Sequence, residues 1–271
     1  MHEFTKLIQT QEYQLERAAL LLAKEVAYAD LDIDANLHQL DELSQAVELR
    51  FSPEDTTRDM LRHVSQLLFE EEGFHGNTND YYDPRNSFLN DVLHRYTGIP
   101  ITLSILYIAV ARRVGLPVYG VGLPGHFIVG CRAEEGHIYL DPFHDGLILT
   151  EEECRQIALE HLPDGMTFTQ TFLAPQSNRM ILTRVLNNLR QIYLATSETL
   201  PLLSVLTLQH LLAPKEPTLH RDIGVLHTHL EHWGQAVRFL RRYIYERPKA
   251  DDIDTIREVL NAAIEKLSQL N

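Results

Sequence analysis

The sequence predicts an α+β protein in which helical segments at both ends of the chain flank a small antiparallel sheet. Three observations carry this prediction. Apolar residues recur at helical spacing through residues 1–72, and short runs rich in β-branched and aromatic residues follow between 118 and 149. From residue 150 onward the spacing is helical again. Because the short runs follow one another closely, we expect them to pair as one antiparallel sheet.

The composition is that of a folded, water-soluble protein. Of the 271 residues, 44% are hydrophobic and 23% are charged, which suits one large domain or two modest ones. The formal net charge of −14 argues against a nucleic-acid partner, because binding to a phosphate backbone needs clustered Lys and Arg.

The cysteines and the apolar runs indicate the compartment. Two cysteines in a chain of this length build no disulfide framework, which favours a reducing compartment. The first residues show no signal peptide, and no apolar stretch reaches the roughly 18–20 residues that span a bilayer. We therefore expect a cytoplasmic protein without membrane contact.

The N-terminal part is expected to consist of helices and one loop. Helical spacing marks three segments, at residues 13–26, 37–51 and 60–68. The stretch from Gly73 to Ser87 is expected to be a loop, since Gly, Asn, Asp and Pro dominate it. A short helix that begins at Phe88 should end at Gly98, because glycine is common at helix C-termini.

The central element is expected to be a buried helix that Pro100 opens and that runs from Ile101 to Val114. Proline suits a first helical position, where its missing N–H group would have no partner. The helix is apolar on nearly all sides, so it should lie inside the core. The strands expected to pack on it lie at residues 118–121, 126–131, 137–140 and 146–149. Thr150 and Glu153 are spaced like a capping box and should begin the next helix.

The last part of the chain, from about residue 176, is helical by its spacing and carries one repeat signal. Gly224, Ala236 and Pro248 fall at equal intervals of twelve. This spacing resembles a tetratricopeptide repeat, in which small residues allow close helix packing and a proline ends the second helix. An earlier copy is degenerate, since Arg190 stands where the repeat's glycine would map. The sequence thus predicts two domains, residues 1–174 and 175–271.

Three residues stand in the order of a cysteine-protease-type catalytic triad. Pro100 begins the central helix, His126 enters a strand, and Asp141 ends the next strand. In such a triad a Cys or Ser at the helix start attacks the substrate, a His acts as base, and a carboxylate orients the His. Proline has no side chain that can attack a carbonyl, so the nucleophile is missing. In the structural alternative, His126 is an ordinary strand histidine and Asp141 closes a turn.

Other side chains are expected to replace the nucleophile poorly. Cys131 lies five residues after His126 in one strand, and this odd offset places the two on opposite faces. Cys154 sits in an acidic helix opening. Ser104, one turn after Pro100 on the same helix face, is the better candidate. Its structural alternative is a hydroxyl bonded to a carbonyl of the preceding turn.

Several histidines and carboxylates near the triad order raise the question of a metal. His126, His137, Asp141, His144 and Asp145 lie close in sequence, and such side chains suit zinc or iron. Their intervals match no compact ligand motif, and strand alternation separates several of them. We therefore expect neither a metal nor a cofactor.

Several further motifs occur together along the chain. They are Gly73-Phe74-His75-Gly76-Asn77, Asp80-Tyr81-Tyr82-Asp83-Pro84 with Asn86-Ser87, Gly98-Ile99-Pro100-Ile101-Thr102-Leu103-Ser104, Pro124-Gly125-His126-Phe127, Asp141-Pro142-Phe143, Arg184-Val185-Leu186-Asn187-Asn188-Leu189 and Arg221-Asp222-Ile223-Gly224. With these motifs the chain resembles the SirB1 family, whose central domain belongs to the transglutaminase-like superfamily. The resemblance implies a papain-like transglutaminase core followed by tetratricopeptide-like helices, in a bacterial cytoplasmic protein.

The resemblance also assigns roles to the triad positions. Active transglutaminase-like enzymes open the central helix with Gly-x-Cys, which maps onto Gly98-Ile99-Pro100 here, and their other two triad members map onto His126 and Asp141. The proline departs from the catalytic pattern. We expect a non-catalytic protein that binds a peptide or protein partner. The alternative is a hydrolase or acyltransferase of unusual mechanism that uses His126 and Asp141.

The loop between Gly73 and Ser87 matches the family closely and is expected to lie near the start of the central helix. In a binding role, Asn77, Tyr82 and Asn86 would line a cleft. In a structural role, the loop residues would only make rigid turns. Both interpretations stay open at the level of sequence.

Overall fold

The chain forms two compact units. The computed structural model describes residues 1–10, 13–134 and 136–270. Its contacts separate His2–Val185 from a second unit that begins at Leu186. The division lies inside helix α8 (Asn178–Ala195), downstream of the boundary predicted between residues 174 and 175.

Residues just after the predicted boundary belong to the first unit by their hydrogen bonds. The backbone N–H of Gln176 donates to the carbonyl of Gly120 at 2.9 Å, and Pro175 forms an isolated bridge with Val121. These contacts attach the segment that leads into α8 to the sheet. The N-terminal half of α8 is therefore part of the core.

The first unit has the predicted α+β architecture. Its helices are α1 (His2–Gln9), α2 (Leu15–Val26), α3 (Ile33–Glu48), α4 (Thr57–Ser65), α5 (Leu89–Arg95), α6 (Pro100–Arg113) and α7 (Glu151–Leu159). Shorter helical segments are the π-helix η1 (Gln66–Glu71) and the 3-10 turns η2 (Pro84–Ser87), η3 (Pro142–His144) and η4 (Gln170–Leu173). The antiparallel sheet runs in the order β3 (Val118–Leu123), β4 (His126–Ala133), β5 (Gly136–Asp141) and β6 (Leu147–Leu149). A separate parallel pair consists of β1 (His75–Gly76) and β2 (Thr97–Gly98).

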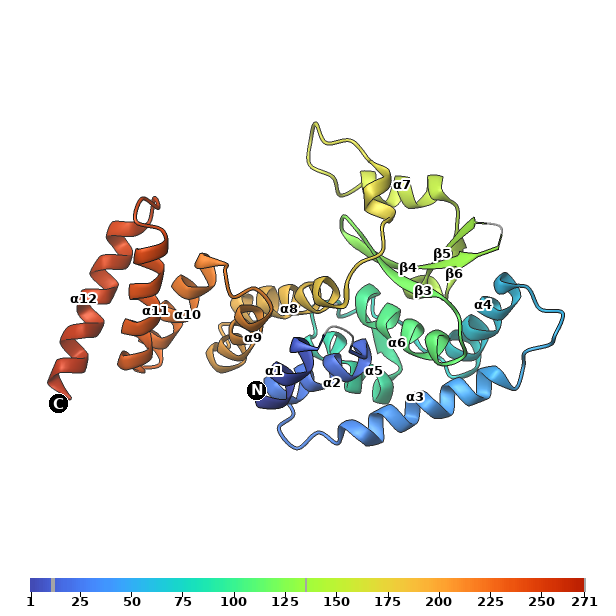
Figure 1. Cartoon of the computed structure of the whole chain (residues 1–271), viewed down its shortest axis with the longest axis horizontal. Helices are drawn as coiled ribbons and strands as arrows, with labels where there is room; N and C mark the ends of the chain where they lie inside the picture. Colours follow the sequence, from blue (N-terminus) through green and yellow to red (C-terminus); the bar gives the residue numbers. More distant parts are fainter. Residues whose placement is uncertain (11–12, 135, 271) are drawn as a thin grey trace. The chain divides into compact units, whose positions relative to one another are not determined.

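Helix α6 is the centre of the first unit. Strands β3 and β4 pack on one side of it, and helices α2 and α3 pack on the other (Figure 1). Every residue from Pro100 to Ala111 is buried. Tyr107 lies inside the core, and its hydroxyl donates to the carbonyl of Leu61 at 2.8 Å. The prediction of a buried central helix is confirmed.

The helix before α6 ends earlier than predicted. Helix α5 stops at Arg95. Tyr96 then adopts the left-handed conformation (φ 57°), which at the end of a helix is usually adopted by a glycine. The predicted end at Gly98 is wrong, since this residue lies in β2 opposite Gly76. A Cβ atom at Gly98 would lie 2.9 Å from Thr102 Oγ1. The glycine therefore permits a close approach to α6.

Helix α7 begins as predicted. The Thr150 hydroxyl accepts the backbone N–H of Glu153 at 3.2 Å, and the Glu153 carboxylate accepts the backbone N–H of Thr150 at 2.7 Å. This capping box satisfies two backbone donors at the helix start. Across the described residues, no helix combines the length and the apolar character needed to cross a bilayer.

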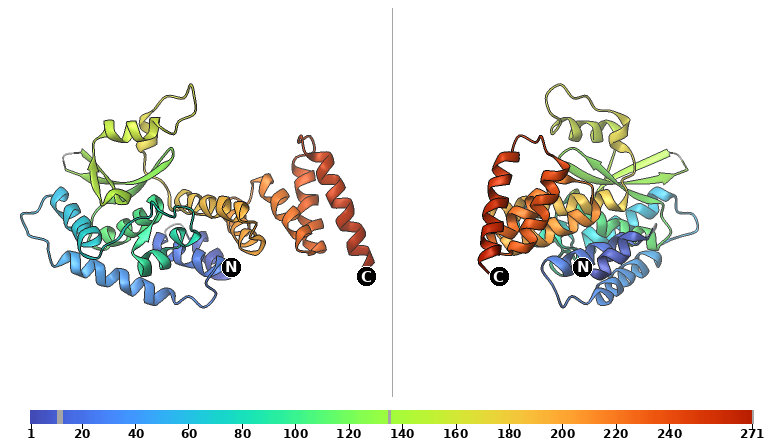
Figure 2. Two further views of the ribbon diagram at one scale, coloured as in Figure 1. Left: turned by 180° about the vertical axis from the view of Figure 1, so that it is seen from behind. Right: turned by 60° about the vertical axis from the view of Figure 1, so that its left-hand side comes forward.

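The second unit is built from helical hairpins. After α8 its helices are α9 (Thr199–Leu212), α10 (Pro217–His229), α11 (Trp233–Glu246) and α12 (Ile253–Gln269). Helices α10, α11 and α12 lie side by side (Figure 2). Gly224 of α10 faces Leu240 of α11, and a Cβ atom on the glycine would lie 2.7 Å from Leu240 Cδ2. Ala236 is fully buried. Both small residues thus permit close helix packing, as the repeat spacing predicts.

Replacement of Gly224 by alanine is expected to destabilise the protein by about 1–3 kcal/mol, because overpacking a helix interface costs this much. The new methyl group would overlap Leu240, whose Cγ lies 2.8 Å and whose backbone N lies 3.1 Å from its position. Gly234→Ala is the matched control, since nothing lies within 4 Å of its Cβ. Urea unfolding followed by circular dichroism measures both variants. Equal stability of the two would contradict the close packing of α10 on α11.

Candidate functional site

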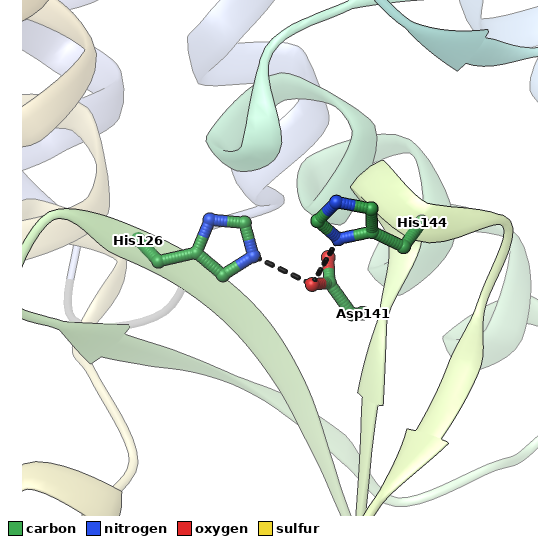
Figure 3. Close-up of side chains that lie close together, drawn as sticks. All are labelled: His126, Asp141 and His144. Atoms are coloured by element: carbon green, nitrogen blue, oxygen red, sulfur yellow. Dashed lines mark hydrogen bonds and ion pairs between the residues drawn. The ribbon is translucent and has the colours of Figure 1, made fainter. Parts of the chain in front are cut away.

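Two neighbouring strands bring the predicted histidine and aspartate together at one end of the sheet. His126 is the first residue of β4, Asp141 is the last residue of β5, and the two strands are antiparallel. His126 Nε2 lies 2.7 Å from Asp141 Oδ2, so its N–H donates to the carboxylate (Figure 3). The two side chains that the triad order predicts as base and carboxylate therefore lie within hydrogen-bond distance of each other.

A second histidine bonds the same carboxylate oxygen. His144 Nδ1 lies 2.7 Å from Asp141 Oδ2, and Figure 3 shows the two imidazoles converging on this oxygen from different elements. The other carboxylate oxygen accepts the backbone N–H of Phe143 at 3.0 Å. The turn η3 folds residue 144 back over Asp141. Sequence reasoning did not pair His144 with Asp141, although an Asp-Pro step at the start of a tight turn was the available signal.

Asp141 is a buried charge whose partners keep it ionised. Its relative exposure is 1%, whereas the side chain of His144 is 63% exposed. Burial alone would raise the pKa of Asp141, but hydrogen bonds and charge interactions with both histidines outweigh burial and lower it. An ionised carboxylate requires His126 to carry a proton on Nε2. In the neutral ring, Nδ1 is then the nitrogen that can accept a proton.

The start of α6 presents the predicted proline. Pro100 is the first helical residue, and the backbone N–H of Ile99 donates to Thr102 Oγ1 at 3.1 Å. Ser104, the candidate substitute nucleophile, is fully buried, and its hydroxyl donates to the carbonyl of Phe127 at 3.4 Å. This partner lies on β4 rather than on the preceding turn of the helix. The hydroxyl therefore contributes to packing between α6 and the sheet.

Both cysteines are buried thiols. Burial raises the pKa of Cys131 to about 11. Burial, together with the nearby carboxylates of Glu153 and Glu151, raises the pKa of Cys154 to about 12. Both thiols are therefore protonated at neutral pH, and a protonated thiol is a poor nucleophile.

Cys131 and Cys154 are expected to resist alkylation in the folded protein. Raising a thiol pKa from 9.0 to about 11 reduces the thiolate fraction about 100-fold at pH 8. Iodoacetamide should modify the folded chain at least about 100-fold more slowly than the same chain in concentrated urea. Mass spectrometry of the quenched reactions measures both rates. Rapid modification of either thiol in the folded chain would contradict this expectation.

The predicted binding residues of the loop divide into two kinds. Asn77 Nδ2 donates to Asn86 Oδ1 at 3.1 Å, and Asn86 Nδ2 donates to the carbonyl of Asp80 at 2.7 Å. Thr102 Oγ1 donates to the carbonyl of Asn86 at 2.7 Å, which ties the loop to the start of α6. The two asparagines thus hold the loop in place. Tyr82 differs from them, because its side chain is 73% exposed and faces solvent.

Arg184 holds the backbone that carries the histidine. Its Nη2 donates to the carbonyls of Leu123 and His126, each at 2.8 Å, and its guanidinium lies 5.6 Å from the ring centroid of Phe127. Burial lowers the pKa of this arginine, although not enough to neutralise it. Sequence reasoning included Arg184 only as part of a family motif, since its position in a helix gives no sign of contacts with the sheet.

Models of two known families match the two parts of the chain. The model described as "Transglutaminase-like superfamily" matches residues 34–187, and the model described as "Tetratricopeptide repeat" matches residues 189–261. The first match covers the sheet, α6 and the His126–Asp141 pair. The second covers the helical hairpins.

Relatives with similar sequences extend over most of the chain. A UPF0162 protein of Xylella fastidiosa (strain Temecula1) is 37% identical over 249 residues, which is 90% of this chain and 87% of the relative. A UPF0162 protein of Vibrio cholerae is 27% identical and covers 93% of this chain and 86% of its own. F-box only protein 21 of Mus musculus is 31% identical over 58% of this chain and 28% of its own. A crystal structure of menin aligns with 95% of this chain and 73% of its own at 11% identity and a TM-score of 0.44, a similarity too weak to inform the fold or the function.

The fold and the His–Asp pair at the end of the sheet define a transglutaminase-like core, and tetratricopeptide-like helices follow it. The chain belongs to the transglutaminase-like superfamily and, by its relatives, to the family of UPF0162 proteins.

Proposed function

We propose that the chain is a non-catalytic transglutaminase-like protein that binds a peptide or protein partner. One observation carries the non-catalytic part. Pro100 occupies the first helical position of α6, so this position offers no thiol, no hydroxyl and no backbone N–H. His126 and Asp141 lie 2.7 Å apart, which supports the view that position 100 is where this chain departs from the catalytic pattern. The burial of Ser104 further supports this assignment.

A groove in the second unit supports the partner-binding part. The groove has a volume of about 570 Å³. Its apolar lining consists of Leu194, Leu202, Leu206, Val225, Leu226 and Ile256. Leu194 is 54% exposed within this lining. Leu202, Leu206, Leu226 and Ile256 are nearly buried, so Leu194 is the most exposed apolar side chain of this lining. A concave site with an apolar lining is typical of a binding site for a partner.

The charges along the groove indicate which kind of segment it would accept. Arg190 forms an ion pair with Asp222, and Arg221 forms ion pairs with Asp222 and Asp252. Because these charges neutralise one another, the groove presents apolar surface rather than a free charge for an acidic or basic terminus. The partner segment would therefore insert apolar side chains such as Leu, Ile or Phe.

The test is selection of binding peptides from a displayed random library, followed by fluorescence anisotropy with a selected peptide. Leu194→Asp should weaken binding at least about 10-fold, because the aspartate would lose water in an apolar groove. Leu200→Asp is the matched control, since Leu200 is 65% exposed and lies outside the groove. Failure to select any peptide, or equal weakening by both substitutions, would argue against the groove.

A hydrolase or acyltransferase of unusual mechanism is the second candidate, and one observation favours it. Asp141 holds Nε2 of His126, which leaves Nδ1 free to take a proton from water. A panel of amide and ester substrates, tested with the wild type and with His126→Ala, decides this candidate. Turnover that disappears in His126→Ala would establish it, and equal rates in both proteins would remove it.

We propose two narrower assignments with this function. The first is membership of the SirB1 family, which the motifs around Pro100 and His126 support. The second is a cytoplasmic location in a bacterium, which fits the two free cysteines and the UPF0162 relatives from Xylella and Vibrio. Fractionation of cells that express the tagged chain tests the location.

A further inference from the structure

We propose that His126, Asp141 and His144 together bind one dication of a first-row transition metal, with Zn²⁺ as the best match. Each residue offers one ligand atom, namely Nε2, a carboxylate oxygen and Nδ1, and these atoms all lie within 4.8 Å of one another. Among the described residues, these three side chains are the group of His, Cys, Asp or Glu whose ligand atoms come close enough to share one ion. The inference goes beyond the proposed function and does not depend on it.

The fold explains how three of the histidines and carboxylates that lie close in sequence come together. The intervals between the three residues match no compact motif, because two of the residues come from strand ends and the third comes from a turn. His126 begins β4, Asp141 ends β5, and His144 is the last residue of η3. The expectation of no metal rests on the sequence intervals and on strand alternation. The structure brings the donors together through sheet pairing and one tight turn.

The charge of the cluster favours a cation. Asp141 is 1% exposed, and its ion pairs in the described chain are with His126 and His144. Each of these histidines is charged only when it is protonated, whereas a metal dication is charged at any pH. Burial of an ionised carboxylate without a full positive charge is costly. A dication at the cluster would supply that charge.

The geometry allows a metal with small movements. Zn²⁺ binds imidazole nitrogen at about 2.0–2.1 Å and carboxylate oxygen at about 2.0–2.2 Å. Both nitrogens already lie 2.7 Å from one oxygen of Asp141, so each must move away slightly to admit the ion. His144 can move, because its side chain is 63% exposed. On binding, each ring would carry its proton on the nitrogen that does not face the metal.

The donor types select among metals. Two imidazoles and one carboxylate are a ligand set of zinc sites that leave a fourth position for water or a ligand. Mg²⁺ and Ca²⁺ prefer oxygen ligands and should not compete. The exposed face of His144 gives solvent a route to this side of the cluster.

The test uses the full chain, first freed of metal with EDTA and then titrated with Zn²⁺ by isothermal calorimetry. We expect one ion per chain and no heat with Mg²⁺. His144→Ala should weaken the Zn²⁺ affinity at least about 100-fold. Loss of a residue that only hydrogen-bonds a metal ligand already costs up to about 100-fold, and His144 would be a ligand itself. His144 is exposed, so this variant should fold normally. Visible absorption of bound Co²⁺, lost in the same variant, gives a second readout.

Two control variants make the assignment specific. His38→Ala removes a histidine of similar exposure (72%) outside the cluster and should bind Zn²⁺ as the wild type does. His232→Ala tests the histidine pair His227–His232, whose Nδ1 atoms lie 3.3 Å apart, and should also leave the affinity unchanged. Absence of Zn²⁺ binding, unchanged affinity in His144→Ala, or loss of binding in His232→Ala would each overturn the proposal. None of these outcomes bears on peptide binding by the groove.

Discussion

Asp141→Ala is expected to lower the free energy of unfolding by about 2–4 kcal/mol, measured by urea denaturation with EDTA present. The substitution removes the acceptor of three hydrogen bonds, from His126, His144 and the backbone of Phe143. The Phe143 N–H and the His126 ring lie in a partly buried environment, where an unpaired donor costs more than a lost hydrogen bond in water. The start of β4 and the turn η3 should both loosen.

The size of the Asp141 effect depends on burial, and a surface aspartate provides the control. Asp164→Ala replaces an exposed side chain in the segment after α7 and should change the stability by less than about 0.5 kcal/mol. His144→Ala should fall between the two, because it removes one partner that is mostly exposed. If Asp141→Ala were as stable as Asp164→Ala, the hydrogen bonds around the carboxylate would not hold this end of the sheet.

Arg184→Met is expected to cost about 2–4 kcal/mol. The variant keeps part of the apolar stem but removes a charged donor from the carbonyls of Leu123 and His126, each at 2.8 Å. It also removes the contact between the guanidinium and the Phe127 ring. Because these carbonyls flank the β3–β4 turn, the loss should be accompanied by a shift of the His126 ring resonances in NMR spectra.

A second arginine separates this effect from a general loss of positive charge. Arg155 is 48% exposed and forms an ion pair with Glu152 on the surface of α7. Arg155→Met should therefore cost no more than about 0.5 kcal/mol, as is usual for exposed ion pairs. Similar losses in the two variants would show that Arg184 has no special role in holding β4.

Periodicity and local chemistry in the sequence predict most of the fold. Helix α6 follows from an apolar run behind Pro100, and the capping box of α7 follows from the spacing of Thr150 and Glu153. The end of α5 could not be predicted. A glycine at position 98 is a plausible helix end by composition. The structure has a glycine there because Thr102 packs closely against it, and this contact depends on tertiary packing.

The candidate site was predictable in part. The order of Pro100, His126 and Asp141 predicts a base and a carboxylate at one end of a sheet, and these two side chains do bond. Their distances to His144 and to the Arg184 guanidinium depend on a turn and on a distant helix. The Arg184 contact joins residues far apart in sequence, and the Asp141–His144 contact depends on the exact geometry of the turn, so neither helical nor strand periodicity predicts them.

The proposed loss of a triad nucleophile at position 100 is tested most directly by introducing a thiol with Pro100→Cys and measuring its alkylation by iodoacetamide between pH 5 and pH 9. The two native thiols should not be alkylated at a measurable rate, since burial raises the pKa of Cys131 to about 11 and that of Cys154 to about 12. With His126 as its base, as the triad order predicts, a thiol introduced at this helix start should have a pKa lowered from about 8.5 to within about 3.5–7.5. Adding His126→Ala should slow its alkylation at pH 6 at least about 10-fold, because an imidazole that accepts the thiol proton favours the thiolate. An introduced thiol with an ordinary pKa, and with the same rate in the presence and absence of His126, would contradict the account.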